Sequence, residues 1–342
     1  MSTELATTFI DTPQLDELEK KLKTVEEILD DLQVSTLTES ELDELDIPPR
    51  SPLLGDWFHE CDLGYIVAKR GIGKTWLALH MARALAEGSA CGPWKAHKAV
   101  KVLYIDGEMP LDSMRKRNQS LREQVNDNLV ILSHQRLFDK TEKNLTLSDP
   151  QVQEAITQLC EKNNISVIFL DNLSTLFTSI RENSADDWRD GVEGWLLNLR
   201  RRKIAVVVVA HAGRNGEMRG TSKREDPAFW QIVLDPSEKK ENGAQFITRF
   251  TKNRGAESDP PPFHWEFKPD SNRVVVTFRE ADPLDILKEL VGLGLTSCSD
   301  IAQEMGTSKT TVSRLAAKAK EAGWLEVKGR GYKLKDPEDE VM

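Results

Sequence analysis

Residues 68–75, Ala68-Lys69-Arg70-Gly71-Ile72-Gly73-Lys74-Thr75, lie between an apolar run that ends at Val67 and a helical pattern that begins at Trp76. A strand, a glycine-rich turn and a helix in this order are typical of a phosphate-binding loop. The glycines let successive backbone N–H groups turn toward a polyphosphate, and the helix N-terminus adds partial positive charge. We therefore expect this stretch to bind a nucleoside triphosphate.

Two side chains at the end of the stretch carry the expected chemistry. Lys74 can reach the β- and γ-phosphates and the Thr75 hydroxyl can hold Mg²⁺, so ATP and Mg²⁺ are the expected ligands. The general pattern begins with glycine, and Ala68 stands at that position here, which restricts its backbone angles. A glycine-rich turn without nucleotide is the alternative, which the strand–loop–helix setting disfavours. The predicted nucleotide contacts are Ala68, Lys69, Arg70, Gly71, Ile72, Gly73, Lys74, Thr75 and Trp76.

The length and the cysteines of the chain limit the classes of protein to which it can belong. With 342 residues it can bury a sizeable core, and we expect one large and one small domain. No apolar run approaches ~20 residues, so no membrane association is expected. The cysteines show no C-x-x-C spacing, which disfavours a disulfide framework or a zinc site and favours a reducing cytoplasm. They are Cys61, Cys91, Cys160 and Cys298.

Charge is distributed unevenly along the chain. The net charge is −10, yet residues 1–47 alone hold 14 acidic and 3 basic residues. Residues 308–335, in contrast, carry 8 Lys and Arg against 2 Glu. A basic module near the end of an otherwise acidic protein favours nucleic acid as its partner, so the overall acidity does not exclude DNA binding.

Residues 1–52 are predicted to form an acidic helix and a linker. Within residues 14–33, apolar side chains recur at the alternating three- and four-residue spacing of an amphipathic helix. They are Leu15, Leu18, Leu22, Val25, Leu29 and Leu32. The helix can pack on its own domain or dock on a neighbouring subunit. The polar, acidic residues 35–52 favour docking, because they read as a linker.

Residues 53–280 alternate between strand and helix patterns, which predicts an α/β domain. Apolar runs that indicate buried parallel strands lie at Ile66, Val102–Ile105, Val130–Leu132, Val167–Leu170 and Ile204–Ala210. Helical stretches between them are Trp76–Ala86, Leu111–Gln124, Asp149–Lys162 and Ala185–Arg202. After residue 221, shorter strands predict antiparallel additions at the sheet edge: Phe229–Leu234, Gln245–Thr251, His264–Phe267 and Arg273–Phe278. A nucleotide binds such a sheet at the carboxyl ends of its parallel strands.

Residues 281–335 are predicted to form a winged helix-turn-helix, and residues 336–342 an acidic tail. Three helical stretches precede two short strands around the turn Lys328-Gly329-Arg330-Gly331. The elements are Leu284–Val291, Ser299–Met305, Ser308–Ala322, Trp324–Val327 and Tyr332–Leu334. Residues 305–308 supply a tight turn, with Ser308 as the N-cap of the third helix.

The third helix and the wing carry the predicted DNA contacts. Their hydroxyl and basic side chains suit phosphates and base edges. The predicted contacts are Lys309, Thr310, Thr311, Arg314, Lys318, Lys328 and Arg330. Val312, Leu315, Ala316 and Ala319 recur at the spacing of a helix face that packs inward. A winged helix that binds only protein partners is the alternative.

Hydrolysis of the nucleotide needs a carboxylate for Mg²⁺ and a base for the attacking water. Asp171 ends an apolar run and is predicted to be the Mg²⁺-associated acid. Asn172 follows it, where many ATPases place a catalytic glutamate, so the base must lie elsewhere. Glu108, after another apolar run, is the predicted base, and Asp106 is the second candidate. A solvated loop acid is the alternative role for Glu108.

His211 ends the apolar run that is predicted to lie beside the strand of Asp171. A polar side chain at that position can contact the γ-phosphate and transmit its loss to the following loop. That loop, residues 213–219, is basic and glycine-rich, which favours this function over a histidine that is merely satisfied within the core.

These segments resemble the RecA-like ATPases of the plasmid RepA type, which are close to the DnaB-type hexameric helicases. The resemblance covers about residues 53–255, through the phosphate loop and the segments LYIDGEMP, VIFLDN, AHAGRNGEMRGTSKRED and FTKNRG. It implies a RecA-like core, a homo-oligomeric ring, hexameric in that family, and ATP hydrolysis at subunit interfaces. It also implies that Glu108 is the base, Asp171 the Mg²⁺-associated acid and His211 the γ-phosphate sensor.

The resemblance further implies that each site is completed by a neighbouring subunit. Lys252 and Arg254, in the sequence Lys-Asn-Arg-Gly, match the basic finger that enters the adjacent site. An arginine supplied in this way raises turnover by ~10³–10⁵ because it neutralises charge in the transition state. A basic surface turn is the alternative, and Arg219 is a second candidate finger.

The leading functional hypothesis is a DNA-dependent ATPase ring that acts as a helicase in the replication of a plasmid or mobile element. Replication or mobile-element proteins are then its expected partners. Residues 181–187 and 213–218, which include Arg214, are implied to face the ring channel and touch single-stranded DNA. Two alternatives stay open: an ATP-controlled DNA-binding regulator or partition protein, and a recombination mediator with the same core.

Overall fold

The computed structural model describes residues 24–178, 185–213, 226–237, 243–305, 307–328 and 331–335. The chain divides into two compact units, residues 1–49 and residues 50–342. None of the described helices is long and apolar enough to cross a membrane. All four cysteines are free thiols, in agreement with their unpaired spacing in the sequence.

The first unit holds two short helices, α2 (Val25–Ser35) and α3 (Glu39–Glu44). Both begin with a capping box, in which a threonine and the glutamate three residues later exchange hydrogen bonds. The apolar stripe of α2 is exposed, and the part of the predicted stripe before residue 24 lies outside the described residues. Helix α3 falls within residues 35–52, the predicted linker, where Thr38 and Glu41 form the capping box at its start.

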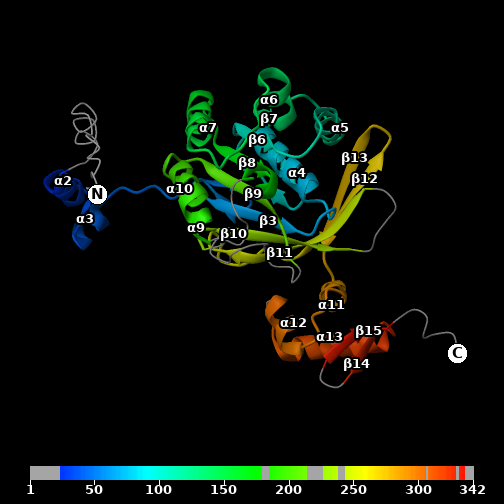
Figure 1. The fold of residues 1–342 in the computed structure, drawn as a ribbon. Helices are drawn as coiled ribbons and strands as arrows, with labels where there is room; N and C mark the ends of the chain where they lie inside the picture. The colour runs from blue at the N-terminus through cyan, green and yellow to red at the C-terminus, as the bar shows by residue number, and fades with distance from the viewer. Residues whose placement is uncertain are drawn as a thin grey trace, which may run out of the picture. The chain divides into compact units, whose positions relative to one another are not determined.

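The second unit is built on a nine-stranded sheet in the order β13-β12-β11-β10-β3-β9-β8-β6-β7 (Figure 1). Its strands are β3 (Leu63–Ala68), β6 (Val102–Asp106), β7 (Leu129–Ser133), β8 (Val167–Asp171), β9 (Ala205–His211), β10 (Trp230–Pro236), β11 (Ala244–Asn253), β12 (Phe263–Asp270) and β13 (Arg273–Glu280). Small hairpin sheets join β1 (Pro52–Leu54) with β2 (Phe58–His59) and β4 (Ala90–Cys91) with β5 (Trp94–Lys95).

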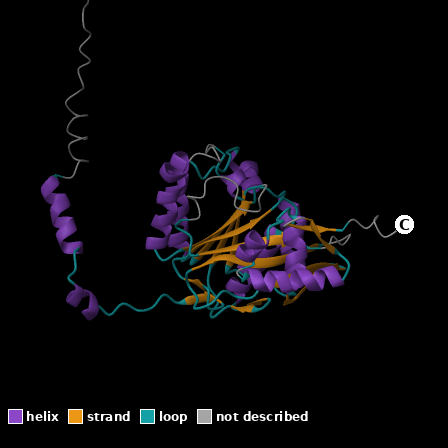
Figure 2. Ribbon diagram, turned by 90° about the horizontal axis from the view of Figure 1, so that it is seen from below, coloured by secondary structure: helices purple, strands orange, loops and turns teal. Residues whose placement is uncertain are grey.

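Helices pack against both faces of this sheet, as Figure 2 shows. They are α4 (Lys74–Glu87), α5 (Leu111–Leu121), α6 (His134–Thr141), α7 (Pro150–Asn163), α8 (Leu173–Leu176), α9 (Ala185–Trp188), the π-helical turn η1 (Arg189–Glu193) and α10 (Gly194–Arg201). Along β3, Ile66 and Ala68 join the core beneath α4, whereas Tyr65 and Val67 join the core beneath α7, α8 and α10. Burial on both faces explains the near-continuous apolar runs in the sequence.

Strand β10 runs in a direction that the sequence did not predict. We expected every strand after residue 221 to be antiparallel, but β10 pairs parallel with β3, from Trp230 beside Gly64 to Leu234 beside Ala68. Strand β9 also runs parallel to β3. The length and composition of a short apolar strand do not specify its direction, which the chain before it determines. The antiparallel expectation holds for β11, β12 and β13.

A C-terminal module follows the sheet within the second unit. It consists of α11 (Pro283–Gly292), α12 (Cys298–Glu304), α13 (Lys309–Glu321), β14 (Leu325–Lys328) and β15 (Gly331–Leu334), close to the predicted bounds. Ser308 is the N-cap of α13, as expected, because its hydroxyl accepts a hydrogen bond from the Thr311 N–H at 3.1 Å. Val312, Ala316 and Ala319 face the apolar core of the module.

Strand β11 contacts both the core beneath α4 and the C-terminal module. Phe246 on one face packs in the core beneath α4, and Ile247 on the other face is buried with residues of α11, α12 and α13. On that second face, Arg249 Nε donates to Asp235 Oδ2 at 2.5 Å and its Nη1 donates to the Glu304 carbonyl at 3.0 Å. Both charged side chains of the Arg249–Asp235 pair are buried, so loss of Arg249 would leave a buried carboxylate without its partner. Arg249 also has an ion pair with Glu304 Oε2, at 3.3 Å.

Candidate nucleotide-binding site

The phosphate loop leaves β3 at Ala68 and enters α4 at Lys74. Gly71 and Gly73 have φ angles of 79° and 128°, in the region that favours glycine. A Cβ atom on Gly73 would also lie only 2.8 Å from the ring of Phe246. Glycine is therefore required at position 73 both by the backbone turn and by the close approach of β11. The turn exposes the N-terminus of α4, whose first N–H groups have no partner within the helix.

A cavity of about 510 Å³ opens over this loop, within the range of ~300–1,000 Å³ typical of small-molecule sites. Six predicted nucleotide contacts line it: Arg70, Gly71, Gly73, Lys74, Thr75 and Trp76. Ala68 and Lys69 instead accept hydrogen bonds from Lys74 through their carbonyls, and Ile72 packs against the core beneath α4. The predicted residues Glu108, Asp171 and His211 line the same cavity.

Lys74 lies at the centre of this arrangement. Its Nζ is 3.0 Å from the Ala68 carbonyl, 3.1 Å from the Lys69 carbonyl and 3.1 Å from Nδ1 of His211. Burial lowers the pKa of Lys74 to about 8, although the nearby carboxylates of Asp171 and Glu108 act in the opposite direction. Burial disfavours the charged form of Lys74, and a bound polyphosphate would stabilise that form by giving the ammonium an anionic partner. The site therefore fits the β- and γ-phosphates of a nucleotide.

Asp171 and Thr75 come together at the foot of the cavity. Tyr104 donates its hydroxyl to Asp171 Oδ2 at 2.6 Å, and Thr75 hydrogen-bonds to the same carboxylate. Burial raises the pKa of Asp171, against the effect of these two hydrogen bonds. A carboxylate and a hydroxyl are hard oxygen donors, so the pair fits Mg²⁺. Tyr104 lies inside an apolar run, and its sequence context gave no sign of this contact.

The two candidate bases differ in their surroundings. Asp106 is 1% exposed, and its Oδ1 accepts hydrogen bonds from the N–H groups of Glu108 and Met109 at 3.3 and 3.2 Å. Burial raises the pKa of Asp106 to about 6. Its Oδ2 is buried with no hydrogen-bond partner among the described residues. Glu108 is exposed, and its Oε2 accepts a hydrogen bond from the amide of Asn172. Asp106 shapes the turn, and Glu108 is the more accessible carboxylate.

Lys252 and Arg254 lie at the opposite end of the sheet from their own phosphate loop. Asn253 pairs with Trp230, which pairs with Gly64 at the start of β3, whereas the loop leaves β3 at Ala68. Four residues of strand separate these levels, about 13 Å at ~3.3 Å per residue. Lys252 Nζ donates to the Asp226 carbonyl at 3.1 Å. Lys252 and Arg254 therefore lie away from the phosphate loop of their own chain.

Some predicted residues lie elsewhere or outside the described residues. Arg214, Arg219 and Arg330 are among the latter, as are most of the predicted channel-facing loops, although residues 185–187 belong to α9. On α13, Lys309, Thr310, Arg314 and Lys318 are exposed, and Thr311 is half-buried. Lys328 ends β14.

Sequence reasoning missed an aromatic and basic pair at the mouth of the cavity. The guanidinium of Arg117, from α5, lies 4.6 Å above the ring centroid of Trp76. Both residues line the loop cavity, and both also line an adjoining hollow of about 790 Å³ that extends to the turn at Asn272. A stacked guanidinium holds the indole ring in place. Arg117 has no motif around it in the sequence, because only the packing of α5 brings it there.

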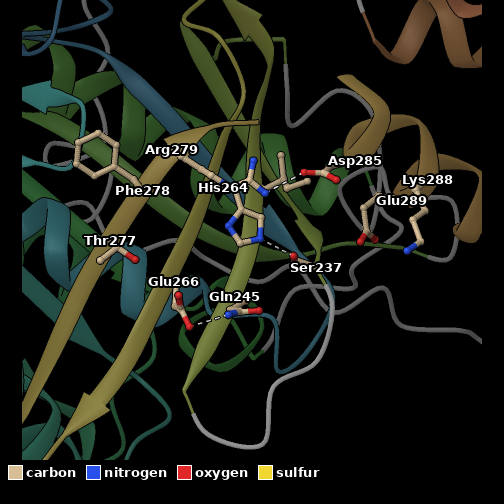
Figure 3. A pocket seen from close by; sticks show the side chains of 11 residues that line it. Ser237, Gln245, His264, Glu266, Thr277, Phe278, Arg279, Asp285, Lys288 and Glu289 are labelled. Carbon is tan, nitrogen blue, oxygen red and sulfur yellow. Dashed lines mark hydrogen bonds and ion pairs between the residues drawn. The ribbon is translucent and has the colours of Figure 1, made fainter. Parts of the chain in front are cut away.

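A second cavity, of about 570 Å³, is lined by β11, β12, β13 and α11 (Figure 3). Six of its polar side chains form three pairs: His264 with Ser237 at 2.7 Å, Gln245 with Glu266 at 2.9 Å and Arg279 with Asp285 at 2.9 Å. Such pairs satisfy each other and do not converge on a common point. The loop cavity is therefore the better candidate for a functional site.

The fold and the phosphate loop define a RecA-like P-loop ATPase. Residues 28–217, more than half of the chain, match the AAA_25 family, described as an AAA domain, so the chain belongs to that family. A comparison with curated proteins gave no match. Among solved structures, the chain is similar to a KaiC-like protein from the hyperthermophilic archaeon Pyrococcus horikoshii. The identity is 15%, the TM-score is 0.44, and the match covers 67% of this chain and 99% of that one.

Proposed function

We propose that this chain hydrolyses ATP at the subunit interfaces of a homo-oligomeric ring, hexameric in form, and acts as a DNA helicase of a plasmid or mobile element. The observation that carries the proposal is the convergence of Lys74, Glu108, Asp171 and His211 on one cavity over the phosphate loop. These residues come from four neighbouring strand ends, at the sheet edge where an α/β protein binds its ligand.

Four side chains around the cavity have separate parts in the reaction. Lys74 neutralises charge on the β- and γ-phosphates. Thr75 and Asp171 would hold Mg²⁺, which when bound would supply positive charge to the phosphate oxygens. Glu108 accepts a proton from water as the water oxygen bonds to the γ-phosphorus. The bond from that phosphorus to the bridging oxygen then breaks, and ADP leaves with the electron pair.

The opposed positions of the phosphate loop and the Lys252–Arg254 pair support a ring. A chain with complementary features at two different edges associates head to tail, and such interfaces close into rings when the rotation permits. In that arrangement Arg254 of one protomer reaches the ATP held by the next and neutralises charge in the transition state. The exposed apolar side chains of α2 give this unit a surface to bury on a neighbouring subunit.

The C-terminal module supports DNA as the partner. We interpret its three helices and two strands as a winged helix-turn-helix, with α13 entering the major groove of duplex DNA. The apolar side chains of α13 are buried in the module, which leaves Lys309, Arg314 and Lys318 on the outer face. Basic side chains on an exposed helix suit the phosphate backbone, and the threonines beside them suit base edges.

Unwinding of a forked duplex in the presence of ATP and Mg²⁺ tests the helicase proposal directly. The expected result is strand separation by the wild type and none by the Lys74→Ala variant. Particle mass, measured with a non-hydrolysable ATP analogue and single-stranded DNA, should correspond to a closed ring. A protein that binds one duplex sequence selectively, without unwinding, would be a regulator instead, and the helicase proposal would be wrong.

A further inference from the structure

Asn172 uses both ends of its side-chain amide. Its Nδ2 donates a hydrogen bond to Glu108 Oε2, while its Oδ1 accepts from the N–H groups of Ser174 and Thr175 at 3.0 and 3.3 Å. The residue is 1% exposed and is the N-cap of α8. Because backbone N–H groups only donate and a carboxylate only accepts, the amide has one satisfactory orientation. The donor aimed at Glu108 is therefore fixed in place by the first turn of α8.

The backbone that carries Glu108 packs on the same helix. The Gly107 N–H donates to the Asp171 carbonyl at 2.8 Å. A Cβ atom on Gly107 would lie 2.7 Å from both Thr175 Oγ1 and Leu176 Cδ2, so only glycine permits this approach. The Glu108 segment thus contacts the end of β8 through a backbone hydrogen bond, and it contacts α8 through Gly107 and through the N-cap amide of Asn172. The Gly107 contacts fix the backbone at this point, and the Asn172 amide restrains one oxygen of an otherwise exposed carboxylate.

We propose that Asn172 is a positioning residue, which holds the Glu108 carboxylate in the orientation needed to accept a proton from the attacking water. The inference rests on the proposed ATPase function and deepens it. A flexible glutamate samples several rotamers, and each unproductive one lowers the rate without weakening nucleotide binding. An amide bonded to Oε2 keeps Oε1 in a narrow set of directions. The residue after the Mg²⁺-associated acid thus positions the base instead of acting as the base.

Two substitutions separate the amide donor from the helix cap. Asn172→Ser keeps an oxygen that caps α8 well but removes the donor to Glu108. Asn172→Asp keeps the shape and the cap but places a carboxylate against Glu108. We expect kcat to fall ~10–100-fold in Asn172→Ser, and further in Asn172→Asp because like charges repel. The affinity for a fluorescent ATP analogue and the thermal unfolding midpoint should stay close to those of the wild type in both variants.

A double variant shows whether Asn172 acts through Glu108. If it does, Asn172→Ser combined with Glu108→Gln should hydrolyse ATP no more slowly than Glu108→Gln alone, since the group to be positioned is already lost. Thr178→Val is the matched control, because it removes a hydroxyl just after α8 whose hydrogen-bond partner is the Thr146 hydroxyl, at 3.5 Å. Its kcat should remain near that of the wild type.

The outcomes distinguish this inference from the proposed function. Wild-type kcat in Asn172→Ser, or losses that multiply in the double variant, would overturn the positioning role while leaving the ATPase intact. A parallel loss of analogue affinity and thermal stability would assign Asn172 to folding alone and would also overturn it. Absence of ATP hydrolysis by the wild type itself would overturn the proposed function, and the inference with it.

Discussion

The ammonium nitrogen of Lys74 lies 3.1 Å from Nδ1 of His211, so the lysine of the phosphate loop and the last residue of β9 share a hydrogen bond. Strand pairing creates the contact, because Ala68 at the start of the loop lies opposite His211 in the sheet. A phosphate that attracts Lys74 competes directly with the histidine for the same ammonium. His211 therefore has a physical route by which to register whether a phosphate is present.

Replacement of Lys74 by alanine should abolish ATP hydrolysis, because among the described residues it is the one lysine that lines the loop cavity. Lys69→Ala is the matched control, since Lys69 contributes only its carbonyl to the Lys74 contacts and its side chain does not line the cavity. Steady-state phosphate release by the two variants decides the matter. Hydrolysis by Lys74→Ala at the level of the wild type would refute the ATPase assignment.

Replacement of Glu108 by glutamine should retain ATP binding and slow hydrolysis by ~10²–10⁴, the usual size of a general-base effect. Asp106→Asn should slow it less, because Asp106 holds the turn through its Oδ1, and an asparagine oxygen can keep both backbone bonds. Single-turnover hydrolysis and analogue binding should be measured for both variants. A larger loss in Asp106→Asn would identify Asp106 as the base.

Asp106 should also make folding stability depend on pH. Its pKa is raised by burial from the ordinary value of 3.8 to about 6, so the folded state binds a proton more tightly than the unfolded state. Stability contributed by the protonated form is present below pH ~4 and is lost as pH rises through about 6. Asp106→Asn removes this loss and should gain up to about 3 kcal/mol over the wild type at pH 7, but little at pH 4. Urea unfolding at several pH values tests this, and a difference that is constant with pH would contradict it.

Arg254→Ala should bind ATP nearly normally and hydrolyse it ~10³-fold or more slowly if the arginine acts on the neighbouring subunit. Mixing this variant with Lys74→Ala should restore some activity, because one interface in the mixture joins an intact loop to an intact finger. A mixture of Lys74→Ala with Glu108→Gln is the control and should stay inactive, since both changes lie in the same cavity. Hydrolysis that stays at background at every mixing ratio, with subunit exchange confirmed, would leave Arg219 as the lead candidate.

Arg314→Ala should weaken binding to duplex DNA about equally for all sequences if the arginine contacts a phosphate. The slope of log affinity against log salt concentration should then fall by about 1. Lys116→Ala on α5 removes another exposed charge and should leave both quantities unchanged. Fluorescence anisotropy at several salt concentrations measures them. An unchanged slope in Arg314→Ala would favour a protein partner for α13.

The alternating α/β pattern was accessible from the sequence because its signals are local. The glycines and the Lys-Thr pair mark the loop, and burial on both faces makes each parallel strand an apolar run. Helix α6 (His134–Thr141) was missed because it has only 8 residues and none of them is buried, so it forms no long apolar pattern. The direction of β10 was missed because it depends on a pairing with β3, more than 160 residues away in the chain.

The candidate site was only partly accessible from the sequence, for a related reason. Glu108 and Asp171 could be named because each follows an apolar run, and strand order then brings them to one cavity. Asn172 drew attention only as the absence of a glutamate, since its amide contact spans 64 residues. Tyr104 and Arg117 have no local motif, because the position of each depends on a packing partner elsewhere in the chain. Contacts that packing alone creates leave no pattern in a single sequence.

Strand β11 limits how this protein can be divided or recombined. A version shortened after residue 280 would expose Ile247 to water and would remove the Glu304 carbonyl from Arg249. The phosphate loop would be held less firmly as well, because Phe246, the residue before Ile247 in the strand, packs on Gly73. A chimaera that exchanges the last 60 or so residues for a different domain must therefore supply a new apolar cover and a new carbonyl acceptor. Without both, the graft would shift the strand that supports the phosphate loop.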